Sequence, residues 1–218
     1  MSTYVLVHGG NMTTDTWNKL SGRDDYPSGD LLGGRIWDSI IPNIKAHKHS
    51  VFAPTLKDEH ISTLTEHINQ IYRLIEENNL DNVILAGHSY GGMIITGVAS
   101  KIPEKIQHLV YVDAALPDPG QSLFDIIASS GRDPLSFVGL EPAAPYVEKI
   151  EFEAENIKTL PKTYILCTES EFASVTSAAR KKIAAGVKWH YIELPTSHVP
   201  MASMPERFTE LLLEISEK

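Results

Sequence analysis

The chain has 218 residues, of which 42% are hydrophobic and 22% are charged, and its formal net charge is −9. This is the composition of an ordinary globular protein, and the length suits one α/β domain with a full core better than two domains. No stretch gathers Lys and Arg on one face, which argues against nucleic acid and anionic membranes as partners. No apolar run approaches the length of a membrane span.

The only cysteine in the sequence is Cys167, so an internal disulfide is excluded, which fits a reducing compartment. Residues 4–7 read as a strand rather than as part of a signal peptide. We therefore expect a soluble cytoplasmic protein that acts on a small molecule, with the formation of a homodimer left open.

Short apolar runs rich in β-forming residues alternate with amphipathic helical patterns along the chain. This alternation is typical of a parallel sheet covered by helices on both faces. We therefore expect an α/β fold in one domain over residues 1–218. The predicted strands are residues 4–8, 50–53, 83–86, 109–112, 163–167 and 188–192.

The first predicted strand ends at Gly9 and Gly10, which indicate a sharp turn. The segment that follows, residues 18–35, is rich in Gly, Asp and Ser and breaks the alternation of strands and helices. Residues 116–161 break it a second time, with six prolines and weak helical patterns. Both segments leave the carboxyl ends of predicted strands, where open α/β sheets bind ligands. We interpret both as lids rather than as mobile padding.

Two helices carry start signals. Thr63 and Glu66 have the spacing of a capping box, and Ser203 and Glu206 repeat that spacing near the end of the chain. Apolar residues at helical spacing follow each signal and should pack on the sheet. They are Leu64, Ile68, Ile71 and Ile75 in the first helix, and Phe208, Leu211, Leu212 and Ile215 in the second.

Residues 87–91 read Gly-His-Ser-Tyr-Gly, between the apolar run 83–86 and the apolar helical stretch 93–99. A strand, a G-x-S-x-G turn and a helix in this order predict a nucleophile elbow. The hydroxyl of Ser89 would then project above the sheet edge, with the helix N-terminus beneath it. The alternative is a glycine-rich turn whose serine has no catalytic role.

A serine hydroxyl needs a base to remove its proton during attack. In an elbow of this kind, the base is a histidine on the loop after the last strand. Among nine histidines, His198 is the one in that loop, and the others lack the spacing of metal ligands. The developing oxyanion needs two backbone N–H donors, which we expect from Tyr90 and Gly10. The alternative for Gly10 is a role in the tight turn alone.

Three motifs carry a resemblance to a known family. Residues 6–10 read Leu-Val-His-Gly-Gly, residues 87–92 read Gly-His-Ser-Tyr-Gly-Gly, and residues 197–201 read Ser-His-Val-Pro-Met. They resemble the α/β-hydrolase superfamily, in particular its branch of plant methylesterases and hydroxynitrile lyases with bacterial esterase relatives. Ser89, His198, Tyr90 and Gly10 fall on the nucleophile, base and oxyanion positions of that family.

The resemblance implies about six mostly parallel strands in the order 2-1-3-4-5-6, no cofactor and no metal. It also implies hydrolysis of small apolar esters through an acyl-enzyme. Relative to this branch, residues 114–161 correspond to a reduced cap segment, and residues 18–36 to an inserted loop near the active site.

The chain departs from that branch at three positions. The lyases it resembles have a threonine where this chain has Gly9 and a lysine where it has Val199, so cyanohydrin cleavage lacks its polar groups. The triad carboxylate of the family falls on Ser170, and a serine cannot offset the charge of an imidazolium.

Other carboxylates must then be considered for the triad. Asp113 ends the fourth predicted strand, a position similar to that of the acid in some haloalkane dehalogenases, and it ranks first. Glu169 is the alternative acid, and Glu171 or no acid at all comes after it. Asp113 could instead cap its strand end by binding loop amides.

The sequence therefore predicts a carboxylic ester hydrolase with a serine nucleophile. One alternative is a small-molecule binding protein on a hydrolase scaffold with a weakened triad. Another is a lyase or amidase that uses the same cleft. The candidate pocket walls are Trp17, Met93, Leu116 and Met201.

Overall fold

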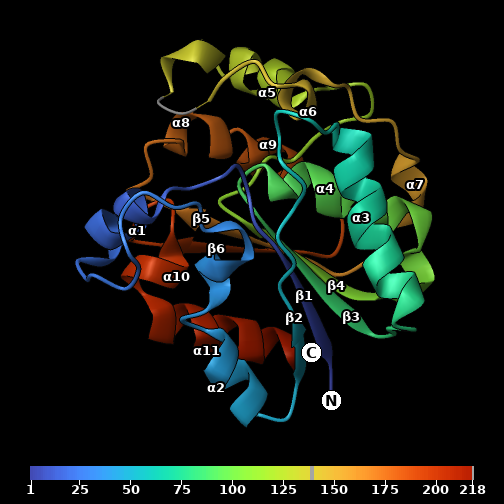
Figure 1. The fold of residues 1–218 in the computed structure, drawn as a ribbon. Coiled ribbons are helices and arrows are strands. Elements are labelled where there is room, and N and C mark those ends of the chain that lie inside the picture. Colours follow the sequence, from blue (N-terminus) through green and yellow to red (C-terminus); the bar gives the residue numbers. More distant parts are fainter. Residues whose placement is uncertain (138–139, 218) are drawn as a thin grey trace.

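The computed structural model describes residues 1–137 and 140–217. Within these residues, six strands form one parallel sheet in the order β2-β1-β3-β4-β5-β6 (Figure 1), which confirms the predicted order. The strands are β1 (Thr3–Val7), β2 (Ser50–Phe52), β3 (Val83–His88), β4 (Ile106–Val112), β5 (Lys162–Cys167) and β6 (Trp189–Leu194).

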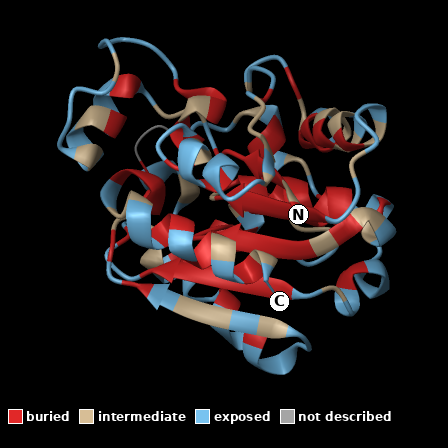
Figure 2. Cartoon of the chain, turned by 90° about the horizontal axis from the view of Figure 1, so that it is seen from below, coloured by how far each residue is buried: buried red, intermediate tan, exposed pale blue. Residues whose placement is uncertain are grey.

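The strands in the middle of the sheet are buried on both faces. Every residue of β3 is buried, and β4 is buried except for Gln107, whereas β2 and β6 at the edges have exposed positions (Figure 2). Parallel sheets behave this way because their crossover helices cover both faces, so their central strands read as continuous apolar runs.

Successive residues along a strand belong alternately to two hydrophobic cores, one on each face of the sheet. Val5, Val7 and Leu85 belong to the core under α3 (Leu64–Glu77) and α4 (Gly91–Lys101). Tyr4, Leu6, Ile84 and Ala86 belong to the other core. That second core lies under α1 (Thr14–Ser21), η1 (Gly33–Trp37), α2 (Ile41–Ala46), α10 (Pro200–Ser203) and α11 (Pro205–Ser216).

The capping box at the start of α3 is confirmed, since the Thr63 hydroxyl accepts from the Glu66 N–H and the Glu66 carboxylate accepts from the Thr63 N–H. The apolar stripes predicted for α3 and α11 are buried. The prediction that Ser203 caps the last helix is wrong. Ser203 ends α10 and donates to the carbonyl of Val199, while α11 begins at Pro205, whose missing N–H suits a first helical position.

The segment between β4 and β5 contributes the cap, and its residues 138 and 139 lie outside the described residues. Its helices α5 and α6 lie over the carboxyl edge of the sheet, at the top of Figure 1. The helices here are α5 (Leu123–Ser129), η3 (Pro134–Ser136), α6 (Ala144–Val147) and α7 (Ala154–Lys158). The remaining helices are η2 (Pro103–Lys105) before β4, and α8 (Ala173–Thr176) and α9 (Ala179–Ala185) between β5 and β6.

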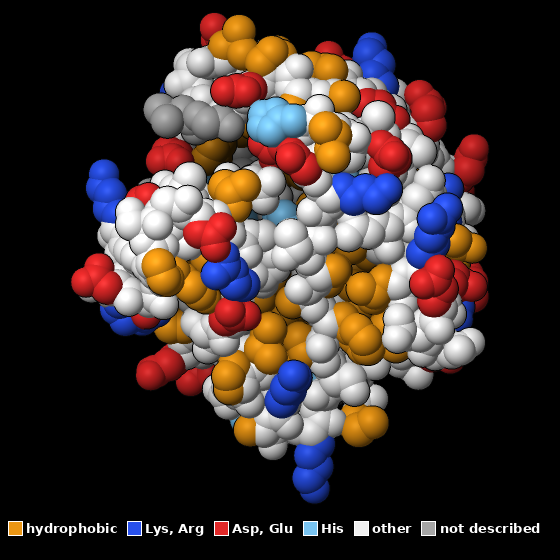
Figure 3. Space-filling model, viewed as in Figure 1, with side chains coloured by type: hydrophobic (Ala, Val, Ile, Leu, Met, Phe, Trp, Pro, Cys, Tyr) orange, Lys and Arg blue, Asp and Glu red, His pale blue; other side chains and the backbone are white. Residues whose placement is uncertain are grey.

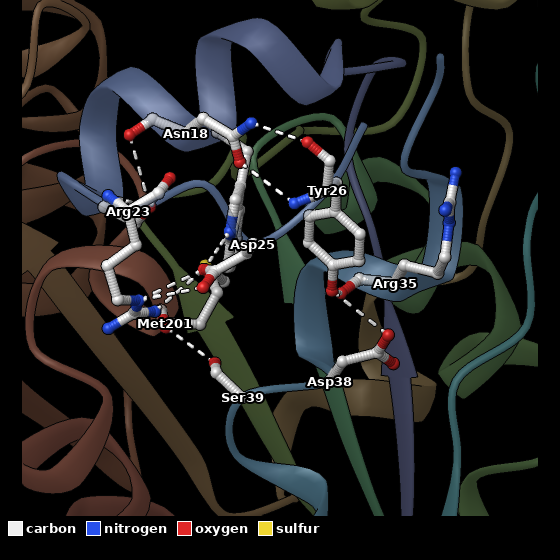
Figure 4. Close-up of polar contacts among 10 residues, drawn as sticks. Asn18, Arg23, Asp25, Tyr26, Arg35, Asp38, Ser39 and Met201 are labelled. Carbon is white, nitrogen blue, oxygen red and sulfur yellow. Dashed lines mark hydrogen bonds and ion pairs between the residues drawn. The ribbon is translucent and has the colours of Figure 1, made fainter. Parts of the chain in front are cut away.

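The segment of residues 18–36 begins within α1 and ends within η1. Side-chain contacts hold it in place (Figure 4). The Asn18 amide donates to the carbonyl of Tyr26 at 2.8 Å, and the Tyr26 hydroxyl donates to Asp38 at 3.1 Å. Asp25 accepts from the indole N–H of Trp17 at 2.9 Å. The segment is therefore an ordered part of the surface beside the sheet edge.

Among the described residues, no helix is both long enough and apolar enough to span a membrane.

Candidate active site

Ser89 stands on the turn between β3 and α4 with a left-handed backbone, at φ 54°. A residue other than glycine seldom adopts this conformation, which is strained. The turn is also tight, because a Cβ on Gly87 would lie 2.6 Å from the Gly91 carbonyl oxygen, and one on Gly91 would lie 2.8 Å from the Val7 carbonyl oxygen. The predicted strand, turn and helix are therefore present in the predicted order.

His198 follows β6 and is bound to Asp113, the residue directly after β4. The imidazole Nδ1 lies 2.6 Å from Oδ2 of Asp113. Because a carboxylate can only accept, Nδ1 carries the proton, and Nε2 is left with the lone pair of a base. The other oxygen of Asp113 accepts from the N–H of Cys167 at 3.2 Å.

Asp113 is 1% exposed, and its backbone is left-handed at φ 42°. Burial by itself would raise the pKa of this carboxyl group. Hydrogen bonds from His198, from the Ser170 hydroxyl and from the Cys167 N–H outweigh the burial and hold the pKa below its ordinary value. Asp113 is therefore an anion at neutral pH, although it lies in the core.

Ser170 lies beside the same imidazole, with its hydroxyl oxygen 3.4 Å from Nδ1 of His198. It accepts from the N–H of Phe172 at 3.1 Å. Glu169 and Glu171 are exposed. Of the three carboxylates considered from the sequence, Asp113 is thus the one that the structure brings to Nδ1.

The loop after β1 approaches Ser89 closely. A Cβ on Gly9 would lie 2.7 Å from the Cβ of Ser89, so glycine is required here by contact distance. His8 fixes the loop, because its Nδ1–H donates to the Gly9 carbonyl at 2.7 Å and its Nε2 accepts from the Leu56 N–H at 2.9 Å. Burial lowers the pKa of His8 to about 4, so the ring stays neutral and keeps both bonds.

Ser89, His198, Asp113, Gly10 and Tyr90 all line one cavity of about 300 Å³. One of its walls is apolar and comes from the cap and the start of α8. The other comes from the loop after β1 and the first turn of α1. The apolar wall is formed by Leu123, Ile127, Leu140, Tyr146, Phe172 and Val175, and the polar wall includes Asn11, Thr13 and Thr16. Figure 3 shows this face of the molecule hollowed below the cap.

Residues 5–137 match the family model of the alpha/beta hydrolase fold. The chain belongs to this family. It is 37% identical over 136 residues to a carbendazim hydrolyzing esterase of Nocardioides sp., an alignment that covers 58% of this chain and 48% of the relative. It is 29% identical over 143 residues to methylesterase 8 of Arabidopsis thaliana, covering 61% of this chain and 53% of that protein. The chain thus spans about half the length of these relatives.

Two solved structures have the same fold as this α/β hydrolase. An extracellular α/β-hydrolase from a Paenibacillus species superimposes with a TM-score of 0.73 at 21% identity, over 100% of both chains. Polyneuridine aldehyde esterase superimposes with a TM-score of 0.70 at 20% identity, over 99% of both chains. Plant methylesterases and bacterial esterases are among the relatives, which confirms the resemblance stated from the motifs.

The sequence did not indicate a role for His88, the second residue of the elbow. In this α/β hydrolase its Nε2–H donates to the carbonyl of His198 at 2.8 Å, and the two rings lie 4.6 Å apart. Burial lowers the pKa of His88 to about 3, so it acts as a neutral donor that holds the loop of His198. His88 is the last residue of β3, and it lines the cavity beside His198.

The predicted pocket walls are wrong. Trp17, Met93 and Met201 are buried in the two cores, and Leu116 lines a separate small cavity. In the part of the chain that the structure describes, no group of three or more His, Cys, Asp or Glu side chains could hold a metal ion.

Proposed function

We propose that this protein is a serine hydrolase of carboxylic esters, with Ser89 as nucleophile, His198 as base and Asp113 as the triad acid. The observation that carries the proposal is the 2.6 Å bond between His198 and the buried Asp113, next to a cavity that Ser89 also lines. The serine, its base and the group that orients the base are then together at one sheet edge.

In the proposed reaction, Oγ of Ser89 attacks the ester carbonyl while Nε2 of His198 takes its proton. The backbone N–H groups of Gly10 and Tyr90 stabilise the negative charge on the carbonyl oxygen. The carbon–oxygen bond to the alcohol breaks, and the alcohol leaves with the proton from His198. Water then attacks the acyl-enzyme with His198 again as base, which releases the acid and restores Ser89.

The cavity supports a small, uncharged ester as substrate. Its volume suits a small molecule, and its cap wall is apolar. Among the described residues that line it, the carboxylates are Asp113 and Glu171, and there is no lysine or arginine. An anionic substrate would thus meet carboxylates and no cation. The relatives named as carbendazim hydrolyzing esterase, methylesterase and pyrethroid hydrolase are consistent with ester hydrolysis.

The alternative of a binding protein depended on a missing triad acid at Ser170. The contact between Asp113 and His198 removes that reason, because a carboxylate now orients the imidazole from another strand.

The proposal also keeps the cytoplasmic location, which the single, buried Cys167 supports. The homodimer stays a prediction.

Hydrolysis of short-chain nitrophenyl esters tests the proposal. Wild type should turn these esters over, and Ser89→Ala should fall to the rate of the buffer alone. A Ser174→Ala variant, which changes an exposed serine of α8, serves as the control and should keep the wild-type rate. Equal rates for wild type and Ser89→Ala would overturn the proposal.

A further inference from the structure

Glu59, on the connection between β2 and α3, joins two parts of the cavity wall. A single carboxylate oxygen, Oε2, accepts from the N–H of Asn11 at 3.3 Å and from the hydroxyl of Tyr146 at 2.5 Å. Asn11 directly follows Gly10 on the loop after β1, and Tyr146 belongs to α6 of the cap. Figure 1 shows this connection rising to the cap beside α6.

Tyr146 touches both residues that we propose as oxyanion donors. Its side chain is buried and lines the cavity. A Cβ on Gly10 would lie 2.7 Å from its hydroxyl oxygen, and its ring meets the ring of Tyr90 edge-on, with centroids 5.0 Å apart. A change in the position of Tyr146 would therefore alter the positions of both Gly10 and Tyr90.

The direction of the hydrogen bonds is fixed by chemistry. Burial and the neighbouring Glu59 carboxylate raise the pKa of Tyr146, so the phenol keeps its proton and donates it. The Asn11 N–H can only donate. Oε2 of Glu59 thus accepts both hydrogen bonds.

We propose that Glu59 is a positioning residue that couples the cap to the oxyanion hole. This inference rests on the proposed function. By holding the Asn11 N–H, the carboxylate fixes the orientation of the preceding peptide units, including the N–H of Gly10. By holding Tyr146, it seats the cap against that same loop. The oxyanion hole keeps its working geometry only while Glu59 holds both Asn11 and Tyr146.

A second carboxylate provides a matched control. Glu148, the residue after α6, accepts from the N–H of Thr65 at 3.2 Å and from its hydroxyl, at the start of α3. This contact also ties the cap to the body of the protein, but neither Glu148 nor Thr65 is among the described residues that line the cavity. Glu148→Ala therefore loosens the cap without touching the oxyanion loop.

The test compares Glu59→Ala, Glu59→Gln, Tyr146→Phe and Glu148→Ala on one nitrophenyl ester. For Glu59→Ala we expect kcat to fall about 10- to 100-fold, the range that a misplaced catalytic group costs. We expect KM to change by less than about threefold, since the loss concerns the transition state. Glu59→Gln keeps an acceptor oxygen and should recover most of kcat. Glu148→Ala should keep the wild-type kcat.

Inhibition by a trifluoromethyl ketone supplies a second readout, because its adduct with a serine places an oxyanion in the hole. Its inhibition constant should rise in Glu59→Ala by about the factor by which kcat falls. In a double-mutant cycle, Glu59→Ala and Tyr146→Phe should be non-additive.

An unchanged kcat in Glu59→Ala, or an equal loss in Glu148→Ala, would overturn the coupling while leaving the hydrolase proposal intact. Wild type and Ser89→Ala acting alike on the ester would overturn both proposals.

Discussion

The carboxylate of Asp113 receives hydrogen bonds from the imidazole of His198 and the N–H of Cys167, and the nearby Ser170 hydroxyl also lowers its pKa. These donors explain how an anion is stable at a position that is 1% exposed. They also replace what an aspartate at position 170 would supply. Ser170 lies beside the imidazole, with its hydroxyl oxygen 3.4 Å from Nδ1, but it is not the acid.

Asp113→Asn tests this assignment. The amide has the same shape but presents a donor or a weaker acceptor to Nδ1, so it favours the wrong tautomer of His198. We expect kcat to fall by a factor on the order of 10⁴, as for loss of the acid in other triads. Steady-state kinetics on a nitrophenyl ester measures this.

Glu169→Gln is the matched control, because Glu169 is exposed and was the alternative acid. It should leave kcat unchanged. A full loss in Glu169→Gln together with an active Asp113→Asn would move the acid role to Glu169.

At the scale of elements, the sequence was most informative where a local pattern sufficed. The six strands, the capping box at Thr63 and the turn around Ser89 follow from runs and spacings a few residues long, whereas the strand order was implied by the family resemblance. The start of α11 was predicted wrongly. The Ser203 hydroxyl donates to the carbonyl of Val199 instead of capping α11, and α11 begins at Pro205 without a side-chain cap.

Contacts between residues far apart in the sequence could not be predicted from local patterns. His88 meets His198 across 110 residues, and Glu59 meets Tyr146 across 87 residues. No periodicity or spacing encodes such pairs. The pocket walls were wrong for the same reason, since cap helices of four to seven residues carry too weak a pattern to orient their side chains.

The walls contributed by the cap and α8 predict a preference for uncharged esters. A nitrophenyl ester whose acyl chain ends in a carboxylate should have a kcat/KM at least about tenfold below that of its methyl-ended counterpart of equal length, since an anion is desolvated beside Asp113 and Glu171 without a cation to pair with. Paired kinetics at two salt concentrations measures the ratio. Glu171→Gln should reduce the ratio between the two kcat/KM values. Equal kcat/KM values for the two esters in wild type would contradict the proposed substrate class.

At the scale of the whole molecule, two buried neutral histidines make stability depend on pH. Burial lowers the pKa of His8 to about 4 and that of His88 to about 3, from an ordinary value of 6.5. Between these values and 6.5, the unfolded chain binds protons that the folded chain does not. Stability is therefore complete above pH 6.5 and falls as the pH decreases toward 4.

Urea unfolding at pH 7, 6, 5 and 4 should show this fall, with each histidine contributing up to about 1.4 kcal/mol per pH unit to the slope. His88→Gln should reduce the slope, because glutamine does not titrate. His190→Gln, which changes an exposed residue of β6, should leave it unchanged. A slope that is the same in wild type and His88→Gln would show that His88 is not buried in its neutral form.

The most direct test of the account is covalent labelling of the intact protein with a fluorophosphonate, followed by peptide mass mapping. We expect one adduct, on Ser89, formed rapidly in wild type and at a rate reduced by orders of magnitude in His198→Ala, since the imidazole is the proposed base that activates the serine. Ser89→Ala should take up no label. An adduct on another residue, or labelling of Ser89 at the same rate without His198, would contradict it.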